Sequence, residues 1–515
     1  MKLIQKSGLI LFFSGFFIFS IIPFLGDFKL TDSDLKVNLQ EEHYERLREP
    51  LTSMAGKTYS SNIVFVRDFN KYFEGYNDKF KSEENWNDVI WDDYAFVVTK
   101  AATTGWILDY NLLLFFLSIG VGVLGAMLYI WPAHRQEPAG IKNNGIYFSS
   151  LKARGFLGIV LGVYLIGIYI VLYWFPEYIT NLALIADPLS YALSGSPASQ
   201  WFIYGLIYTL AILVMGIRMF RKYKGNKYQT LRTASVMFFQ LSFAFIIPEI
   251  LVLMNMPWHD FKNIWPLDYS FFFDFRLDQM LSSGALGMFM LVWGIILIVL
   301  GVPLLSYFYG KRWYCSWICG CGGLAETAGD PYRHLSDKSL KAWKIERYMV
   351  HSVLVIIVGV TLVTIANYFA EFDLLGGATG VLHEWYGFII GAAFAGVIGV
   401  GFYPFMGNRV WCRFGCPLAA YIGIVQRFKS RFRITTNGGQ CISCGNCSTY
   451  CEMGIDVKWY AQRGQNIVRA SCVGCGVCSA VCPRGVLKLE NREEAGRINE
   501  HPIIIGNDSV KIHAQ

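Results

Sequence analysis

Long apolar runs separated by polar loops are the main pattern along this chain. One run lies within residues 1–26, and seven more lie near 107–131, 155–175, 200–219, 233–254, 281–308, 348–369 and 386–405. Each is long enough to cross a hydrocarbon core of about 30 Å as an α-helix. A bilayer offers no water to pair with backbone polar groups, so continuous helices are the expected spanning elements. The pattern therefore predicts an all-α polytopic membrane bundle with about eight transmembrane helices.

The N-terminal run is predicted to be an uncleaved membrane anchor. Lys2 and Lys6 precede its apolar residues, but no small-residue cleavage site appears before Asp27. Residues 27–106 are polar and charged, and we expect a small extracytoplasmic segment there, with no structure that the pattern can assign. The remaining parts are a transmembrane domain over 107–434, a cysteine-rich domain over 435–490 and a polar tail over 491–515.

Charge is distributed very unequally between alternate loops. Four loops carry 23 Lys and Arg residues against five acids, and they are 132–154, 218–232, 310–347 and 406–433. The three loops between them carry two basic residues and nine acids. Cytoplasmic loops are the basic ones, so the N-terminus and the cysteine-rich parts are predicted to be cytoplasmic, in a bacterial inner membrane. The net charge of +7 then reflects topology and contact with lipid, and no nucleic-acid partner is expected.

Two cysteine runs stand back to back near the C-terminus: CISCGNCSTYC and CVGCGVCSAVCP. Both have the spacing C-x2-C-x2-C-x3-C, in which three thiolates hold one 4Fe–4S cluster and the fourth holds the neighbouring cluster. The predicted ligand sets of the two 4Fe–4S clusters are therefore crossed. One set is Cys441, Cys444, Cys447 and Cys482, and the other is Cys472, Cys475, Cys478 and Cys451.

Zinc is the alternative occupant of paired C-x-x-C motifs. Zinc ribbons, however, place two cysteines on each knuckle and not four within eleven residues. All 13 cysteines fall in four groups, which favours ligands over packing residues. One departure from bacterial ferredoxins is Glu452, which follows the first run where they commonly have proline. We expect a slightly weaker turn after Cys451 and an unchanged number of ligands.

Two further cysteine motifs stand where predicted helices emerge at basic loops. RWYCSWICGCGG contains Cys315, Cys319 and Cys321, and RVWCRFGCPL contains Cys412 and Cys416. The spacing C-x3-C places two thiols on one face of a helical turn. Two such turns facing each other would bring four soft ligands together for a third iron–sulfur cluster, copper(I) or zinc. Buried free cysteine is the alternative, but the motifs form an internal repeat with similar flanking residues, which favours a metal site.

Taken together, these motifs give the chain a resemblance to a known family. A membrane pair of C-x3-C(P) motifs followed by a two-cluster ferredoxin segment resembles the membrane polyferredoxins of the NosR, NapH and CcoG type. The resemblance covers residues 280–490, with Cys412 to Pro417 matching the family's CxxxCP. It implies a small C-terminal α+β two-cluster ferredoxin domain. In the first membrane motif a Gly-Cys pair replaces the proline, so the resemblance leaves open whether Cys319 or Cys321 is a ligand.

Flavin and haem are not expected. DLLGGAT, from Asp373 to Thr379, is similar to a covalent flavin site, but Gly376 occupies the Ser/Thr position and a flexible glycine loop is the favoured interpretation. Membrane haem requires paired histidines on facing helices. His351 is the one histidine inside a predicted crossing.

Glu249 is the candidate acid of a quinol site. It lies in the apolar stretch FAFIIPEILVLM, and carboxyl groups inside a membrane are functional candidates by default. A polar contact inside the bundle is the alternative. Four other polar residues are candidates for the same site, although ordinary loop surface is the favoured interpretation of each: His259, Asp260, His383 and Glu384.

The leading functional hypothesis is a membrane-bound iron–sulfur electron-transfer protein. It would link the quinone pool to a respiratory or assembly partner protein, and a quinol-oxidising electron-transfer subunit is the candidate enzyme activity. The second hypothesis is copper or iron reduction or delivery for oxidase assembly, in the manner of CcoG, at the membrane cysteines. The third is a redox sensor. All candidate centres lie on the predicted cytoplasmic side, and no group was found that carries electrons across the rest of the bilayer.

Overall fold

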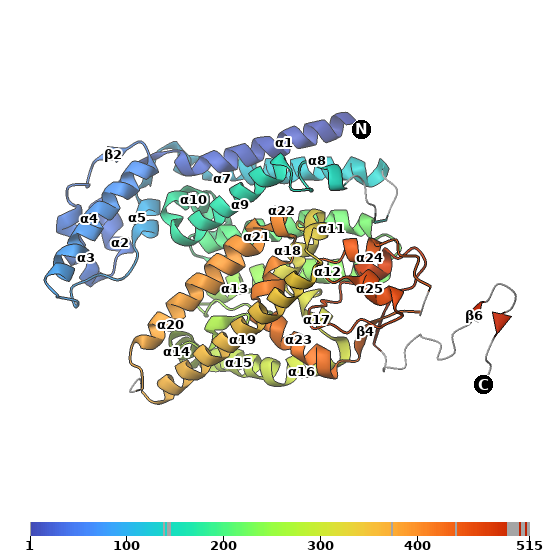
Figure 1. Cartoon of the computed structure of the whole chain (residues 1–515). Coiled ribbons are helices and arrows are strands. Elements are labelled where there is room, and N and C mark those ends of the chain that lie inside the picture. Colours follow the sequence, from blue (N-terminus) through green and yellow to red (C-terminus); the bar gives the residue numbers. More distant parts are fainter. Residues whose placement is uncertain are drawn as a thin grey trace. The chain divides into compact units, whose positions relative to one another are not determined.

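The computed structural model describes residues 2–136, 140–141, 146–371, 374–437, 440–491, 504–505 and 510–511. The chain forms two compact units, and Figure 1 shows their elements coloured along the sequence. The first unit contains Met1–Pro138, Ile168–Leu210 and Glu249–Asn255, and the second contains Ala139–Gly167, Ala211–Pro248 and Met256–Gln515. All the cysteines belong to the second unit.

Eight helical stretches in the described part of the chain are long and apolar enough to cross a bilayer. They are Leu3–Phe24, Asn111–Pro132, Phe156–Trp174, Gln200–Lys222, Lys227–Leu253, Gly284–Tyr309, Leu340–Phe369 and Ala378–Gly401. Large apolar side chains such as Phe13, Phe156 and Leu300 remain exposed on them, which suits contact with lipid. The protein is a multi-pass helical membrane protein, and the predicted fold class is confirmed.

In the first unit, helix α1 (Lys2–Ile21) lies along α8 (Val121–Gln136), as Figure 1 shows. Glycines allow the two backbones to touch, since a Cβ atom added at Gly15 would stand 2.5 Å from the nitrogen of Gly122. Contacts between small residues are typical of helix pairs in membranes, because close backbone packing replaces the hydrophobic effect there.

The polar segment 27–106 has a hydrophobic core of its own. Three short strands pair antiparallel in the order β2-β1-β3: β1 (Asp27–Lys29), β2 (Thr58–Tyr59) and β3 (Thr103–Thr104). Four helices pack with them: α2 (Asp32–Asn38), α3 (Glu41–Leu51), α4 (Asn62–Ser82) and α5 (Ala95–Ala101). Phe28, Phe65 and Val98 are fully buried in this core. The structure thus shows helices and strands in a segment for which the sequence pattern predicted none.

Helix α10 (Thr180–Ser194) joins this polar segment to the apolar helices of the first unit. The side-chain amide of Asn181 donates to the carbonyl of Leu25 at 2.7 Å. The ammonium of Lys100 donates to Asp187 at 2.6 Å, and both side chains are largely buried. The other helices that lie wholly or partly in this unit are α6 (Trp106–Asp109), α7 (Asn111–Phe115), α9 (Phe156–Trp174), α11 (Gln200–Lys222) and α13 (Ile247–Leu253).

The second unit combines longer helices with short helices that contain the first membrane cysteine motif or precede the second. The longer ones are α12 (Lys227–Leu241), α14 (Asp274–Ser282), α15 (Gly284–Ile296), α16 (Val302–Tyr309), α19 (Leu340–Phe369), α20 (Ala378–Tyr386) and α23 (Pro417–Lys429). The short ones are α17 (Arg312–Cys315), α18 (Gly320–Glu326), α21 (Gly399–Gly401) and α22 (Tyr403–Met406). A π-helical stretch, Gly387–Ile398, continues α20.

The C-terminal part of the second unit is a small α+β segment. Strand β4 (Phe432–Thr435) pairs antiparallel with β5 (Lys488–Asn491), with Phe432 opposite Asn491. Three short helices lie between them in the chain: α24 (Asn446–Thr449), α25 (Val457–Gln462) and α26 (Val477–Ala480). The two strands bring the ends of the cysteine-rich stretch together. Of the predicted tail, β6 (Ile504–Ile505) and β7 (Val510–Lys511) are described, and residues 492–503, 506–509 and 512–515 lie outside the described residues.

Candidate metal centres

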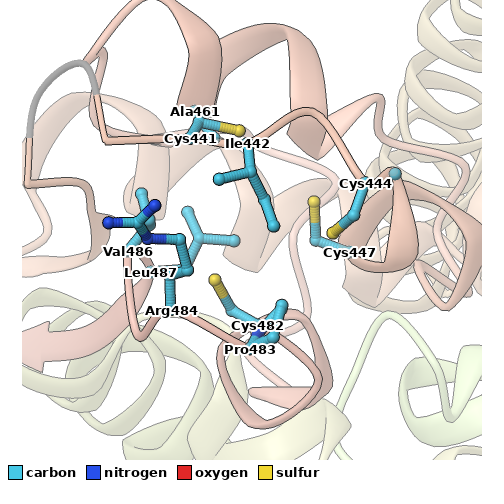
Figure 2. Close-up of a pocket in the computed structure, with 11 residues that line it drawn as sticks. Cys441, Ile442, Cys444, Cys447, Ala461, Cys482, Pro483, Arg484, Val486 and Leu487 are labelled. Carbon is cyan, nitrogen blue, oxygen red and sulfur yellow. The ribbon is translucent and has the colours of Figure 1, made fainter.

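The first pocket of the α+β segment has four cysteines in its wall. Cys441, Cys444, Cys447 and Cys482 line a pocket of about 350 Å³. Figure 2 shows these side chains around one space, with Pro483, Val486 and Leu487 at its edge. Cys447 is buried, Cys444 is exposed and the other two are partly exposed. The four residues are one of the two ligand sets predicted from the spacing.

The second pocket holds the other predicted set. Cys451, Cys472, Cys475 and Cys478 line a pocket of about 380 Å³, together with Glu452, Met453 and Ile467. Cys472 and Cys478 are buried, and the other two are partly exposed. Each pocket therefore combines three cysteines of one run with the last cysteine of the other run.

Equivalent glycines shape the two pockets. Gly445 and Gly476 precede α24 and α26 with φ of +78° and +72°, a left-handed conformation that a residue with a Cβ atom adopts only at a cost. After each glycine, a single helical turn carries the third cysteine of the run, Cys447 or Cys478, towards its pocket. The repeated sequence thus builds two similar local structures.

The cysteine sulfurs also accept backbone hydrogen bonds. The N–H of Ser443 donates to Sγ of Cys441 at 3.4 Å, and the N–H of Ile455 donates to Sγ of Cys451 at 3.3 Å. A ring of four soft sulfur donors with N–H groups turned towards sulfur is the environment of a 4Fe–4S cluster, so the residues present fit that group. Among the described residues, no three His, Cys, Asp or Glu side chains converge on a point that would hold a single metal ion.

Residues of the transmembrane domain hold the loop of the second pocket. The hydroxyl of Tyr228 donates to the carbonyl of Gly474 at 2.7 Å, and the amide of Gln229 donates to that of Cys475 at 2.5 Å. Two more such bonds reach the same loop: Ser316 Oγ to the carbonyl of Val473 at 2.7 Å and Gln426 Nε2 to that of Cys472 at 2.9 Å. Buried carbonyls need such partners, so the second pocket is fixed to the transmembrane domain. Nothing in the sequence pattern indicated these four side chains.

The five remaining cysteines come together in the second unit. Cys315, Cys319, Cys412 and Cys416 are buried in one core, and Cys321 packs against it. Burial raises the pKa of Cys416, and the neighbouring Cys412, Cys315 and Cys319 raise it further. The structure therefore brings the two C-x3-C motifs together. We call these five residues the membrane cysteine group.

Hydrogen-bond donors and cations surround the membrane cysteine group. The N–H of Ala419, in the first turn of α23, donates to Sγ of Cys416 at 3.4 Å. Burial acts to raise the pKa values of Cys315 and Cys319. The positive charge of Lys311 acts in the opposite direction on Cys315, and that of Lys262 does so on Cys319. Positive charge stabilises thiolates, so this environment also fits a thiolate-bound metal centre.

A buried network of charges lies beside the second pocket and the membrane cysteine group. Nη2 of Arg409 lies 2.6 Å from Oε1 of Glu326 and 3.2 Å from Oε1 of Glu452. Arg232 pairs with the other oxygen of Glu326, and Nη1 of Arg333 lies 3.4 Å from Oε2 of Glu452. Burial disfavours ionisation of Glu452, but these arginines outweigh burial and lower its pKa. We call these five residues the charge network. Sequence reasoning missed it, because a charged residue in a basic loop carries no sign that it will be buried.

The loop between α13 and α14 reaches the membrane cysteine group. The carbonyl of Lys262 accepts a hydrogen bond from Tyr314 at 2.9 Å, and Ile264 packs in the same core as the thiols. His259 and Asp260 are 3% and 7% exposed. Their interpretation as loop surface is therefore wrong, because the loop folds inward and buries them. Asp260 accepts from Lys262 at 2.8 Å.

The other candidates lie elsewhere. Glu249 is half-buried in α13 and belongs to the first unit, whereas the cysteines belong to the second. His383 stacks on Phe273 with ring centres 3.5 Å apart, and Glu384 is exposed. Of the DLLGGAT stretch, Asp373 lies outside the described residues. The quinol-site role of Glu249 stays a prediction.

Comparison with known proteins supports iron–sulfur chemistry in the second unit. A family model described as a 4Fe-4S binding domain matches residues 291–340 and 387–435, which include both membrane cysteine motifs. A second model, a 4Fe-4S dicluster domain, matches residues 412–487. Fold and site together define a class: a multi-pass membrane protein with iron–sulfur binding segments of the ferredoxin type.

One curated relative is similar to part of the chain. "Putative electron transport protein YccM" of Escherichia coli (strain K12) is 26% identical over 154 residues. The alignment covers 28% of this chain and 43% of the relative, so it spans less than half of that protein. No solved structure matches the chain significantly.

Proposed function

We propose that this protein is a membrane-bound iron–sulfur electron-transfer protein. The observation that carries the proposal is the division of eight cysteines into two pockets of four, each with three cysteines from one run and one from the other. This arrangement is expected of two 4Fe–4S clusters with crossed ligands. The relative named as an electron transport protein supports the same function. When bound, such clusters accept and release single electrons.

The chain's own residues give the two pockets different access. Cys444 is exposed at the first pocket, so a soluble redox partner protein can approach that side. The second pocket has no exposed cysteine, and Tyr228 and Gln229 donate hydrogen bonds to its loop. Electron transfer rates fall steeply with distance, so a partner would exchange electrons with the first pocket, and the second pocket would serve the membrane side.

The membrane cysteine group is proposed as a third centre. Four of its thiols suffice for an iron–sulfur cluster, and Cys319 and Cys321 are alternative ligands within it. The presence of a fifth thiol keeps copper(I), and with it metal reduction or delivery, as the second candidate function of this group. Copper bound by the purified protein and lost in Cys412→Ser would favour the second function over the first.

Quinol is proposed as the membrane donor, with Glu249 as the candidate proton acceptor. The apolar setting of Glu249 in α13 supports a role beyond packing. The unequal loop charges support a bacterial inner membrane location with the cysteine pockets on the cytoplasmic side. A reporter fused behind Gln515 tests this topology, since activity outside the cytoplasm would contradict it.

The decisive experiment is the measurement of iron and acid-labile sulfide per chain, with EPR, on detergent-purified protein. Two 4Fe–4S clusters predict about 8 Fe, and a third in the membrane cysteine group predicts about 12. Zinc in place of iron would overturn the proposal. Addition of menaquinol or ubiquinol to the same sample tests the donor: cluster reduction is expected, and Glu249→Gln should slow it.

A further inference from the structure

Two arginines of the charge network donate hydrogen bonds to cysteine sulfur. Nη1 of Arg333 lies 3.9 Å from Sγ of Cys475, in the second pocket. Nη1 of Arg409 lies 3.7 Å from Sγ of Cys412, in the membrane cysteine group. A donor to sulfur stabilises the negative charge that a thiolate-bound centre gains on reduction. Each arginine therefore acts on a different group of cysteines.

Glu452 connects these two arginines. Its Oε2 lies 3.4 Å from Nη1 of Arg333, and its Oε1 lies 3.2 Å from Nη2 of Arg409. Its backbone carbonyl accepts from Ser336 at 2.6 Å, so the residue is held at both ends. It directly follows Cys451 and lines the second pocket. At the equivalent place after the other run the chain has Pro483, which carries no charge.

The surroundings make these contacts strong. The side chains of Arg333, Arg409 and Glu452 are at most 1% exposed. Water screens such charges little, so a change at one of them is felt at its neighbours. Arg333 also contacts Asp330, which binds Lys222 at 2.6 Å. The four cations Arg232, Arg333, Arg409 and Lys222 thus face the three carboxylates Glu326, Glu452 and Asp330.

We propose that Arg333, Glu452 and Arg409 form an electrostatic bridge that sets the redox potentials of the second-pocket centre and of the membrane cysteine centre together. The proposal rests on the proposed function, because it requires a redox centre at both places. None of the three residues takes part in the redox change. Glu452 is a positioning residue: it orients each arginine towards its sulfur and opposes the positive charge of both.

The signs of the expected effects follow from charge. Reduction adds one negative charge to a centre, so removal of the Glu452 carboxylate makes reduction easier and raises the potentials of both centres. Loss of an arginine donor makes reduction harder and lowers the potential of the centre that it contacts. A role in folding alone would change stability without this pattern of opposite shifts.

The test is an EPR-monitored redox titration of the full chain in detergent. Glu452→Gln, which keeps the shape and removes the charge, should move both potentials in the positive direction. The matched control is Glu490→Gln, a buried acid of β5 whose carboxylate accepts from Thr435 at 2.8 Å and pairs with Lys488 at 3.1 Å. Neither potential should move in the control.

Charge-conserving variants test each arm of the bridge. A lysine ammonium is a point charge and cannot serve sulfur and two carboxylates as a guanidinium does. Arg333→Lys should therefore lower the potential of the second-pocket centre alone, and Arg409→Lys that of the membrane centre alone. These two lysine variants also test the proposal if Glu452→Gln binds no iron.

The proposal is overturned if Glu452→Gln has its full iron content and shifts only one potential or none. It is also overturned if each lysine variant shifts both potentials equally. A failure of the proposed function can be distinguished from these outcomes. In that case the unsubstituted protein itself would contain no redox-active iron.

Discussion

The two pockets of the α+β segment have the same cysteine spacing but different surroundings. The first pocket is lined by the α+β segment and includes the exposed Cys444. The second pocket has loops that accept hydrogen bonds from Tyr228 and Gln229 of α12, and it borders the charge network. The motif thus determines which sulfurs meet, whereas the surroundings determine access and electrostatics. The two pockets should therefore have the same number of ligands but differ in thermal stability and in the accessibility of their iron.

The largest effect is expected from loss of the third cysteine of each run. Cys447 and Cys478 are 7% and 6% exposed and equivalent in position. Cys447→Ser and Cys478→Ser should each remove about four of the about eight iron atoms expected in the α+β segment. Cys478→Ser should also lower the thermal midpoint in detergent, because its loop is bound to α12. Full iron content in either variant would contradict the ligand sets, and equal thermal midpoints would contradict the difference between the pockets.

A smaller effect should appear in the rate at which iron is removed. A strong iron chelator added to the oxidised protein reaches the first pocket through the exposed Cys444. Iron loss should therefore have a fast phase that accounts for about half of the iron of the α+β segment. In Cys447→Ser the fast phase should be absent, since that variant has lost the first cluster. A single phase in the unsubstituted protein would show that both pockets are equally accessible.

The smallest effect is expected from two matched glycine substitutions. Gly445→Ala and Gly476→Ala both place a Cβ atom at positive φ, which costs about 1–2 kcal/mol. At Gly445 the new Cβ has no neighbour within 4 Å. At Gly476 it stands 3.1 Å from Nε2 of Gln229 and from a ring carbon of Tyr228, which adds on the order of 1 kcal/mol. The thermal midpoint should fall further for Gly476→Ala, and a larger fall for Gly445→Ala would contradict the attachment of the second pocket to α12.

The sequence by itself determined the features that depend on local patterns. The length of the apolar stretches predicted the eight membrane-spanning helices, because the thickness of the hydrocarbon core sets how many apolar residues a crossing needs. Cysteine spacing determined the iron–sulfur character of residues 412–487, because three of the four ligands expected for each cluster come from one short run. The segment 27–106 was expected as a small polar segment, but its sheet could not be predicted, since strands of two or three residues carry no readable alternation.

Only the tertiary structure decided which charges are buried and what they contact. Arg333, Arg409 and Glu452 are separated by 76 and 43 positions in the chain, so no spacing rule links them. His259 and Asp260 were expected at the surface, because hydropathy cannot distinguish a loop in water from one that folds inward. Burial of a charge depends on partners that arrive from distant segments. For that reason the groups of cysteines could be predicted from the sequence, whereas the buried charges that lie beside them require the fold.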